Sequence, residues 1–179
     1  MAAASGRYAR AFAEVIFEQK MDPDTAVQEL KGMTELIQSS AELRQVFENP
    51  SVPHDQKIRL LDSIVARTRR SKLLRNFVAV LIDHRQIRQI KEIAEQFRHE
   101  LNRRMGIAEA AVVSARTMAA GEKKALESRI ASLTGKTVRA TYEQDPALLG
   151  GAIVRVGSTL YDGSVRGRLE RLKHQIAGA

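Results

Sequence analysis

Residues 148–172 read LLGGAIVRVGSTLYDGSVRGRLERL, and the role of the glycines in this stretch decides the fold. The five are Gly150, Gly151, Gly157, Gly163 and Gly167. Glycines between an apolar run and a basic helix can form a loop that binds phosphate, or they can form the turns of a small sheet. A dinucleotide-binding GxGxxG loop follows a strand and opens a helix, and this stretch has no such motif in that position. We therefore interpret Gly150, Gly151, Gly157 and Gly163 as turn residues.

The turn interpretation predicts how this stretch folds. Residues 152–156 and 159–161 flank Gly157-Ser158, a dipeptide suited to a tight β-hairpin. From Ser164 onward the spacing of apolar residues predicts a basic helix. Its inward face is expected to hold Val165, Leu169, Leu172 and Ile176. At the Asp162-Gly163 turn, a β-branched residue in place of Gly163 would be strained if φ there is positive.

The segment before this stretch completes a small α+β domain. Residues 107–115 are rich in small and β-branched residues and predict a strand, and residues 137–142 alternate as a half-buried strand does. Between them, residues 121–135 predict a helix that ends at Gly135 and turns Leu126, Ile130 and Leu133 inward. We place this domain at residues 106–179, because the helical pattern stops at Met105-Gly106.

Residues 1–105 have helical periodicity almost throughout. Polar caps and prolines divide the pattern: Asp22-Pro23, Ser40, Asn49-Pro50, Pro53 and Ser71 mark starts or stops. The spacing predicts six helices with short connections, which favours an antiparallel bundle. The predicted fold class is thus mainly α, an N-terminal antiparallel six-helix bundle followed by a small α+β C-terminal domain.

Composition narrows the function classes. The 179-residue chain has no Cys, which excludes disulfides, thiolate metal sites and cysteine nucleophiles. The N-terminus has no secretory signal pattern, and no stretch approaches the roughly 18 apolar residues of a membrane span. The net charge of +8 allows a nucleic acid, an anionic membrane surface or an acidic protein as partner. Each predicted domain carries a net charge of +4, so neither is a basic arm.

The motifs that could carry chemistry are weak. Residues 134–137 read TGKT, the end of a phosphate-loop motif, but a helix precedes them and a strand follows, which is the reverse of the required order. The histidines, His54, His84, His99 and His174, show no HxxxH or HExxH pairing. A basic cluster between residues 67 and 75 lacks nearby aromatic residues for base stacking. We predict no catalytic residue, no metal site and no cofactor.

Two predicted helices are more apolar than a surface helix requires. The first carries Ala9, Ala13, Ile16 and Phe17 on a second face, and the fifth contains the run LLRNFVAVLI at residues 73–82. An apolar surface wider than one face of a helix indicates either that the helix is buried at the centre of the bundle or that it lines a groove for a partner helix. The residues leave both interpretations open.

Three segments together resemble a known family. They are ASGRYARAFAE at 4–14, NPSVP at 49–53 and the glycine-containing stretch at 148–172. With these motifs the whole chain resembles the delta subunit of the bacterial rotary ATP synthase, a relative of the mitochondrial oligomycin-sensitivity conferral protein. The glycine spacing and the DGSVRGRLERL sequence are the most specific part of the resemblance.

The resemblance implies a non-catalytic stator subunit that links the catalytic head to the peripheral stalk. It implies that residues 1–105 bind the N-terminal helices of alpha subunits and that residues 106–179 join b-type stalk subunits. It also implies a peripheral location at the cytoplasmic face of the bacterial inner membrane, where the subunit is attached only through the complex. Nucleic acid is not among the partners that it implies. Carried onto this chain, the partner-binding residues are Tyr8, Ala9, Phe12, Ala13, Ile16, Val78, Leu81 and Ile82.

Two other classes of function remain as alternatives. A small basic nucleic-acid-binding protein would bind any polyanion with an affinity that falls steeply with salt. An enzyme whose site is assembled by folding would have a deep polar pocket with perturbed titratable groups.

Overall fold

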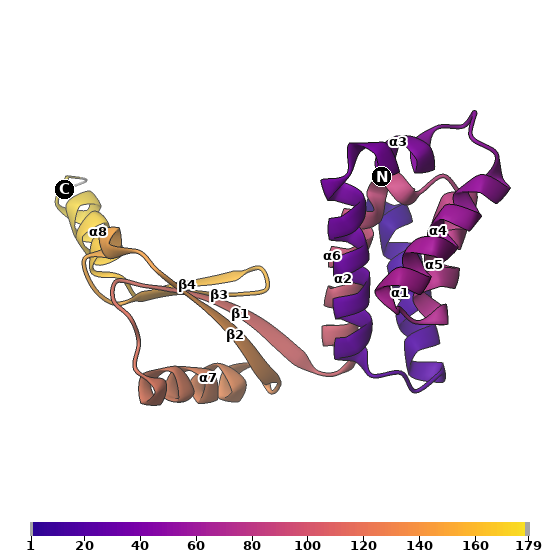
Figure 1. Cartoon of the computed structure of the whole chain (residues 1–179). Helices are drawn as coiled ribbons and strands as arrows, with labels where there is room; N and C mark the ends of the chain where they lie inside the picture. Colours follow the sequence, from indigo (N-terminus) through magenta and orange to yellow (C-terminus); the bar gives the residue numbers. More distant parts are fainter. Residues whose placement is uncertain (1, 178–179) are drawn as a thin grey trace. The chain divides into compact units, whose positions relative to one another are not determined.

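The computed structural model describes residues 2–177, with the side chains of residues 5–170, 172 and 173. The chain divides into two units, one up to Leu101 and one from Asn102 onward, which we call the helical unit and the sheet unit (Figure 1). Within the described residues there are eight α-helices and one four-stranded sheet. The prediction of a mainly helical chain with a small sheet is confirmed, and the antiparallel six-helix arrangement stays a prediction.

Side-chain caps set the ends of several helices in the helical unit. Asp22 accepts a hydrogen bond from the Thr25 backbone N–H at 2.8 Å, and Ser71 accepts one from the Leu74 N–H at 3.2 Å. Such caps satisfy N–H groups that have no partner inside the helix. The helices are α1 (Ala2–Glu18), α2 (Pro23–Ser39), α3 (Ala41–Glu48), α4 (His54–Thr68), α5 (Lys72–Asp83) and α6 (Ile90–Arg104), with a 3₁₀ turn η1 (Ile87–Gln89) before α6.

The core of the helical unit is aliphatic with one aromatic centre. The Phe12 ring of α1 stacks on Phe77 of α5 at 4.0 Å between ring centroids and is tilted against Phe97 of α6 at 4.7 Å. Around it, the fully buried side chains include Leu30, Met33, Ile37, Leu61, Leu74, Ile90, Ile93 and Leu101. Burial of these apolar groups, rather than helix propensity, supplies most of the stability of such helices.

The sheet unit has the strand order β2-β1-β3-β4. Its elements are β1 (Ile107–Ser114), α7 (Ala120–Thr134), β2 (Thr137–Gln144), η2 (Pro146–Leu148), β3 (Ala152–Val156), β4 (Thr159–Asp162) and α8 (Val165–Ala177). Strand β1 pairs parallel with β2, through the α7 crossover, and antiparallel with β3. Ile130 of α7 packs on Ala110, Val112 and Val154, so one face of the sheet is covered by that helix.

Four glycines of residues 148–172 lie in the connections around β3 and β4, whereas Gly167 lies inside α8. Gly157 has a φ of 58° in the two-residue hairpin between β3 and β4. Gly151 has a φ of 75°, and a Cβ there would collide with the carbonyl oxygen of Gly163. Gly163 itself is not among the residues with positive φ, so the predicted reason for its strain is wrong. A Cβ at Gly150 would contact the Val165 side chain, and one at Gly167 would collide with the Asp162 carboxylate.

Two predicted inward faces are wrong in part. In α8, Val165, Leu169 and Leu172 are 42%, 53% and 53% exposed, because the helix contacts the η2 turn and leaves its apolar face open. The side chain of Ile176 lies outside the described residues. In α7, Leu126 and Ile130 belong to the core against the sheet, whereas Leu133 lies outside that core and is 68% exposed.

Candidate partner-binding surfaces

The residues predicted to contact a partner helix lie mostly inside the helical unit. Tyr8 is half-buried. The other seven, Ala9, Phe12, Ala13, Ile16, Val78, Leu81 and Ile82, are at most 5% exposed. They pack α1 and α5 into the core, so no open groove is lined by them. Partner binding by these eight residues stays a prediction.

Helices α1 and α5 lie against each other through two ring contacts. Besides the Phe12–Phe77 stack, the Tyr8 ring lies 6.0 Å from the imidazole of His84, the residue that ends α5. These contacts fix which side of each helix faces the other. Residues one turn away from these rings lie next to them along the surface of their own helix.

Several of these neighbouring residues are apolar and exposed or half-buried. Ala11 and Val15 follow Tyr8 at the i+3 and i+7 positions of α1, and Leu73 and Val80 flank Phe77 at i−4 and i+3 of α5. Val15 is 36% exposed and Val80 is 41% exposed. We call Tyr8, Ala11, Val15, Leu73 and Val80 the α1–α5 flank. The predicted partner-binding residues include Tyr8 but none of the other four, although the row formed by Tyr8, Ala11 and Val15 could have been found from its helical spacing.

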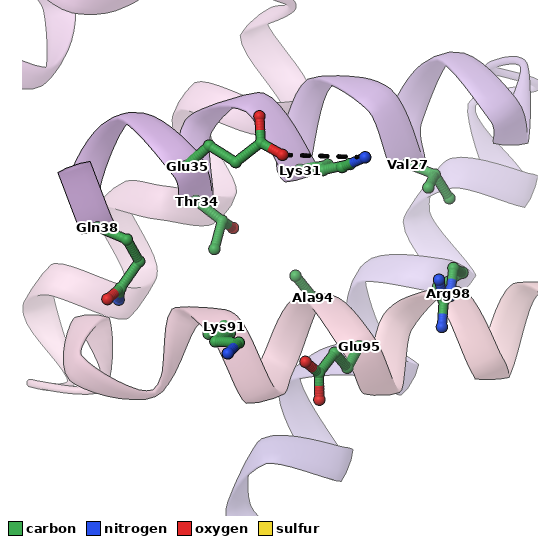
Figure 2. A pocket seen from close by; sticks show the side chains of 9 residues that line it. All are labelled: Val27, Lys31, Thr34, Glu35, Gln38, Lys91, Ala94, Glu95 and Arg98. Atoms are coloured by element: carbon green, nitrogen blue, oxygen red, sulfur yellow. Dashed lines mark ion pairs between the residues drawn. The ribbon is translucent and has the colours of Figure 1, made fainter. Parts of the chain in front are cut away.

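A shallow groove of about 400 Å³ lies between α2 and α6 (Figure 2). It is lined by Val27, Lys31, Thr34, Glu35, Gln38, Lys91, Ala94, Glu95 and Arg98. Lys31 and Glu35 form an exposed ion pair at 3.8 Å along α2. The Thr34 hydroxyl donates to the Leu30 carbonyl at 2.8 Å, so this hydroxyl is engaged by the backbone of its own helix. The groove thus has a small apolar floor and a rim of mixed charge.

The sheet unit exposes a second apolar surface at α8. Val165, Leu169 and Leu172 repeat at i, i+4 and i+7 and form one row on the helix. Leu149 is 70% exposed and has a left-handed backbone conformation. It precedes Gly150, whose carbonyl oxygen accepts a hydrogen bond from the Val165 N–H at 2.9 Å. We call Leu149, Val165, Leu169 and Leu172 the C-terminal stripe. A row of exposed leucines on one helix face is typical of a surface that another molecule covers.

The pKa shifts in the described residues have structural causes. A hydrogen bond from Arg75 holds the pKa of the Asp62 carboxyl below its usual value, and one from Arg116 does the same for Glu122. Asp22 has a lowered pKa because Thr25 donates to it at the start of α2. Burial, with a hydrogen bond to Glu127, raises the pKa of Tyr142 to about 12. These groups anchor turns, helix ends and the α7–β2 contact.

The TGKT segment, the basic cluster and His54, which the sequence analysis tested for chemical function, lie at helix ends or in ion pairs. Gly135 ends α7 with a φ of 67° and β2 follows, so residues 134–137 have the helix-to-strand order expected from the sequence. In the basic cluster, Arg75 pairs with Asp62 at 2.7 Å and Arg70 donates to the Glu29 carbonyl. His54 pairs with Asp83 at 3.0 Å, and the side chain of His174 lies outside the described residues.

The described part of the chain has no metal-binding cluster and no helix that could span a membrane. Among those residues, no group of three or more His, Cys, Asp or Glu side chains is placed to hold a metal ion. Over the same residues, every helix is too short or too polar to span a bilayer.

Comparison with known proteins identifies relatives over the full length. The family model described as "ATP synthase delta (OSCP) subunit" matches residues 4–176. The ATP synthase subunit delta of Koribacter versatilis is 44% identical over 179 residues, which is 100% of both chains. The corresponding subunit of Acidobacterium capsulatum is 40% identical over 99% of both chains.

A solved structure has the same fold. A chain in the mitochondrial ATP synthase hexamer of Toxoplasma gondii superposes with a TM-score of 0.68 over 97% of both chains, at 21% identity. At this identity the likeness concerns the fold alone. These relatives give no support to the nucleic-acid-binding alternative.

Proposed function

Because the chain belongs to the ATP synthase delta (OSCP) subunit family, we propose that it links the catalytic head of the synthase to the peripheral stalk. Subunits of this family are structural, non-catalytic parts of the ATP synthase complex, and they are peripheral components. In the proposed role the helical unit binds N-terminal helices of alpha subunits and the sheet unit binds b-type stalk subunits. The complex then holds this subunit at the cytoplasmic face of the bacterial inner membrane.

One observation carries the proposal: each unit exposes an apolar surface of its own. A protein that joins two partners needs two separate binding surfaces, and the α1–α5 flank and the C-terminal stripe lie in different units. In the flank, Val15 and Val80 are exposed beside a rigid aromatic contact. Rigid surfaces lose little conformational entropy on binding, which favours tight association.

The apolar character of both surfaces suits a long-lived attachment. Burial of apolar area contributes roughly 25 cal/mol per Å² before the cost of association is subtracted. An amphipathic helix laid along the α1–α5 flank would cover Tyr8, Val15 and Val80 together, as helix-in-groove complexes do. The net charge of +4 on each half of the sequence would speed encounter with acidic partners.

The experiment is a double dissociation with two variants of the full-length chain. Val80→Asp places a charge in the α1–α5 flank, and Leu169→Asp places one in the C-terminal stripe. Binding is measured by calorimetry to a peptide of the alpha-subunit N-terminus and to a soluble fragment of the b-type subunit. We expect Val80→Asp to weaken only the alpha contact and Leu169→Asp to weaken only the stalk contact, each by at least about tenfold.

Leu133→Asp is the matched control, because Leu133 is an exposed leucine on α7, outside the C-terminal stripe. It should leave both affinities unchanged. Equal loss of both contacts in each variant, or loss in the control, would contradict the assignment of one partner to each unit.

A further inference from the structure

The helical unit contains a cationic pocket that the proposed linking role does not use. It has a volume of about 370 Å³ and lies where the end of α3, the start of α4 and the connection from α5 to η1 meet. Its lining residues are Phe47, Glu48, Pro50, Lys57, Arg85, Ile87, Arg88 and Gln89. Three of these side chains are basic and one is acidic, so the lining has a surplus of positive charge.

Lys57 is the central feature of this pocket. Its side chain is buried, with the residue only 8% exposed, and its ammonium donates to the Phe47 carbonyl at 2.9 Å. That carbonyl belongs to the last turn of α3, where the helix dipole offers about half a negative charge. Within the described part of the chain, no carboxylate pairs with this ammonium. A buried cation without a full counter-charge is costly unless an anion reaches it.

The one carboxylate in the lining is already engaged. Glu48 accepts from Arg88 at 2.9 Å through both Nε and Nη2. Two further donors remain near Lys57. Arg85 is exposed and is held in a left-handed backbone with a φ of 57°, and Gln89 receives a hydrogen bond on Oε1 from Ser5, which leaves its amide N–H groups as donors.

We propose that this pocket binds a phosphate group. The lining has two positive charges more than negative ones, which matches a dianion. Its donors come from three elements: Lys57 from α4, Arg85 from the segment after α5 and Gln89 from η1. A tetrahedral oxyanion can accept hydrogen bonds from several directions at once, whereas a planar carboxylate offers only two oxygens. This site is independent of the proposed contacts with alpha and b-type subunits.

Titration calorimetry on the full-length chain tests the site with inorganic phosphate, at ionic strength kept constant with chloride. We expect saturable binding with a dissociation constant on the order of 1 mM. Sulfate should compete with phosphate, and acetate should bind more weakly because it is planar and singly charged. A parallel titration with ADP distinguishes the source of the group. Tighter binding of ADP identifies a nucleotide phosphate, and equal or weaker binding identifies free phosphate.

Three variants locate the binding. Lys57→Met should lower the phosphate affinity by at least about tenfold. Because Lys57 is buried and this variant can lose stability, Arg85→Ala provides a second test at an exposed position, with an expected loss of about threefold to fivefold. Arg59→Ala, which removes an exposed arginine of the same helix α4 outside the pocket, should bind as the unchanged protein does. Unchanged affinity in both Lys57→Met and Arg85→Ala would overturn the proposal, as would equal binding of acetate and phosphate.

Discussion

The rings of Phe12 and Phe77 lie 4.0 Å apart with only 7° between their planes. Because Phe12 belongs to α1 and Phe77 to α5, this stack joins two helices that are distant in the sequence. It draws the small residues of α1 into the core with it: Ala9 and Ala13 are 1% and 0% exposed. The second apolar face of α1 is therefore buried in the core at Ala9 and Ala13.

The first prediction uses two alanines of α1 that differ in burial. Ala13→Asp should destabilise the helical unit by several kcal/mol, because its carboxylate would be buried without a partner. Ala11→Asp introduces the same side chain at an exposed position of the α1–α5 flank. It should change the melting temperature little and weaken binding of an alpha-subunit peptide. Thermal melting and peptide calorimetry on both variants make the comparison, and a stable Ala13→Asp protein would contradict the burial argument.

The second prediction concerns the close approach of two glycines. Gly151→Ala should destabilise the sheet unit by about 3 kcal/mol or more, since a positive φ and a collision with the Gly163 carbonyl add together. Gly163→Ala is the control. Its Cβ would lie 3.3 Å from the Ala152 carbonyl oxygen, and its φ is not positive, so the loss should be much smaller. Chemical denaturation of the two variants measures the difference, and equal losses would speak against it.

The third prediction is a pH dependence from Tyr142. Burial and the hydrogen bond to Glu127 raise the pKa of Tyr142 from 10.0 to about 12. A group with a raised pKa in the folded state contributes its stability fully below the unfolded value and loses it as the pH rises through the folded value. The sheet unit should therefore lose stability between pH 10 and about pH 12.

Tyr142→Phe supplies the control for this titration. The variant should lose about 0.5–1.5 kcal/mol at neutral pH, because the hydrogen bond from the phenol to Glu127 at 2.8 Å is removed. It should also lack the part of the alkaline destabilisation that comes from Tyr142. Urea denaturation over a pH series checks both effects, and identical pH profiles would remove Tyr142 as the cause.

The fourth prediction is that residues 1–105 fold alone. The division of the chain falls between Leu101 and Asn102, and the fragment would retain all of α6, which ends at Arg104. Its aromatic centre, Phe12, Phe77 and Phe97, lies entirely within the fragment. Circular dichroism should show mostly helix with a cooperative melting transition. A coil spectrum would argue against independent folding.

The sequence predicted most element boundaries because their causes are local. Asp22, Ser40 and Ser71 each cap a helix by a hydrogen bond to a nearby backbone N–H, which needs no knowledge of the rest of the fold. The hairpin at Gly157 is equally local. Parallel pairing of β1 with β2 depends on the return of the chain through α7, and the sequence analysis did not predict this register.

Contacts between distant elements decided which apolar faces are open. Val15 and Phe12 are three residues apart on α1 and are both apolar, yet Phe12 packs against Phe77 and Phe97 whereas Val15 is 36% exposed. In α8, the row of Leu169 and Leu172 fits an inward face by periodicity, and its exposure follows from the absence of a described element packed over it. Periodicity shows that a helix has an apolar face but does not identify what covers it.

Strand β1 begins three residues after the last helix of the helical unit ends, and this position has a mechanical consequence. β1 is paired with β2 over eight residues and with β3 over five, so both pairings carry any pull at Gly106 that is directed along the β1 axis. Tension in this direction loads the hydrogen bonds of both ladders in shear, so they share the force and must break together. An edge strand pulled sideways would instead open one bond at a time. The central position of β1 thus spreads a load along its axis over two strand pairings.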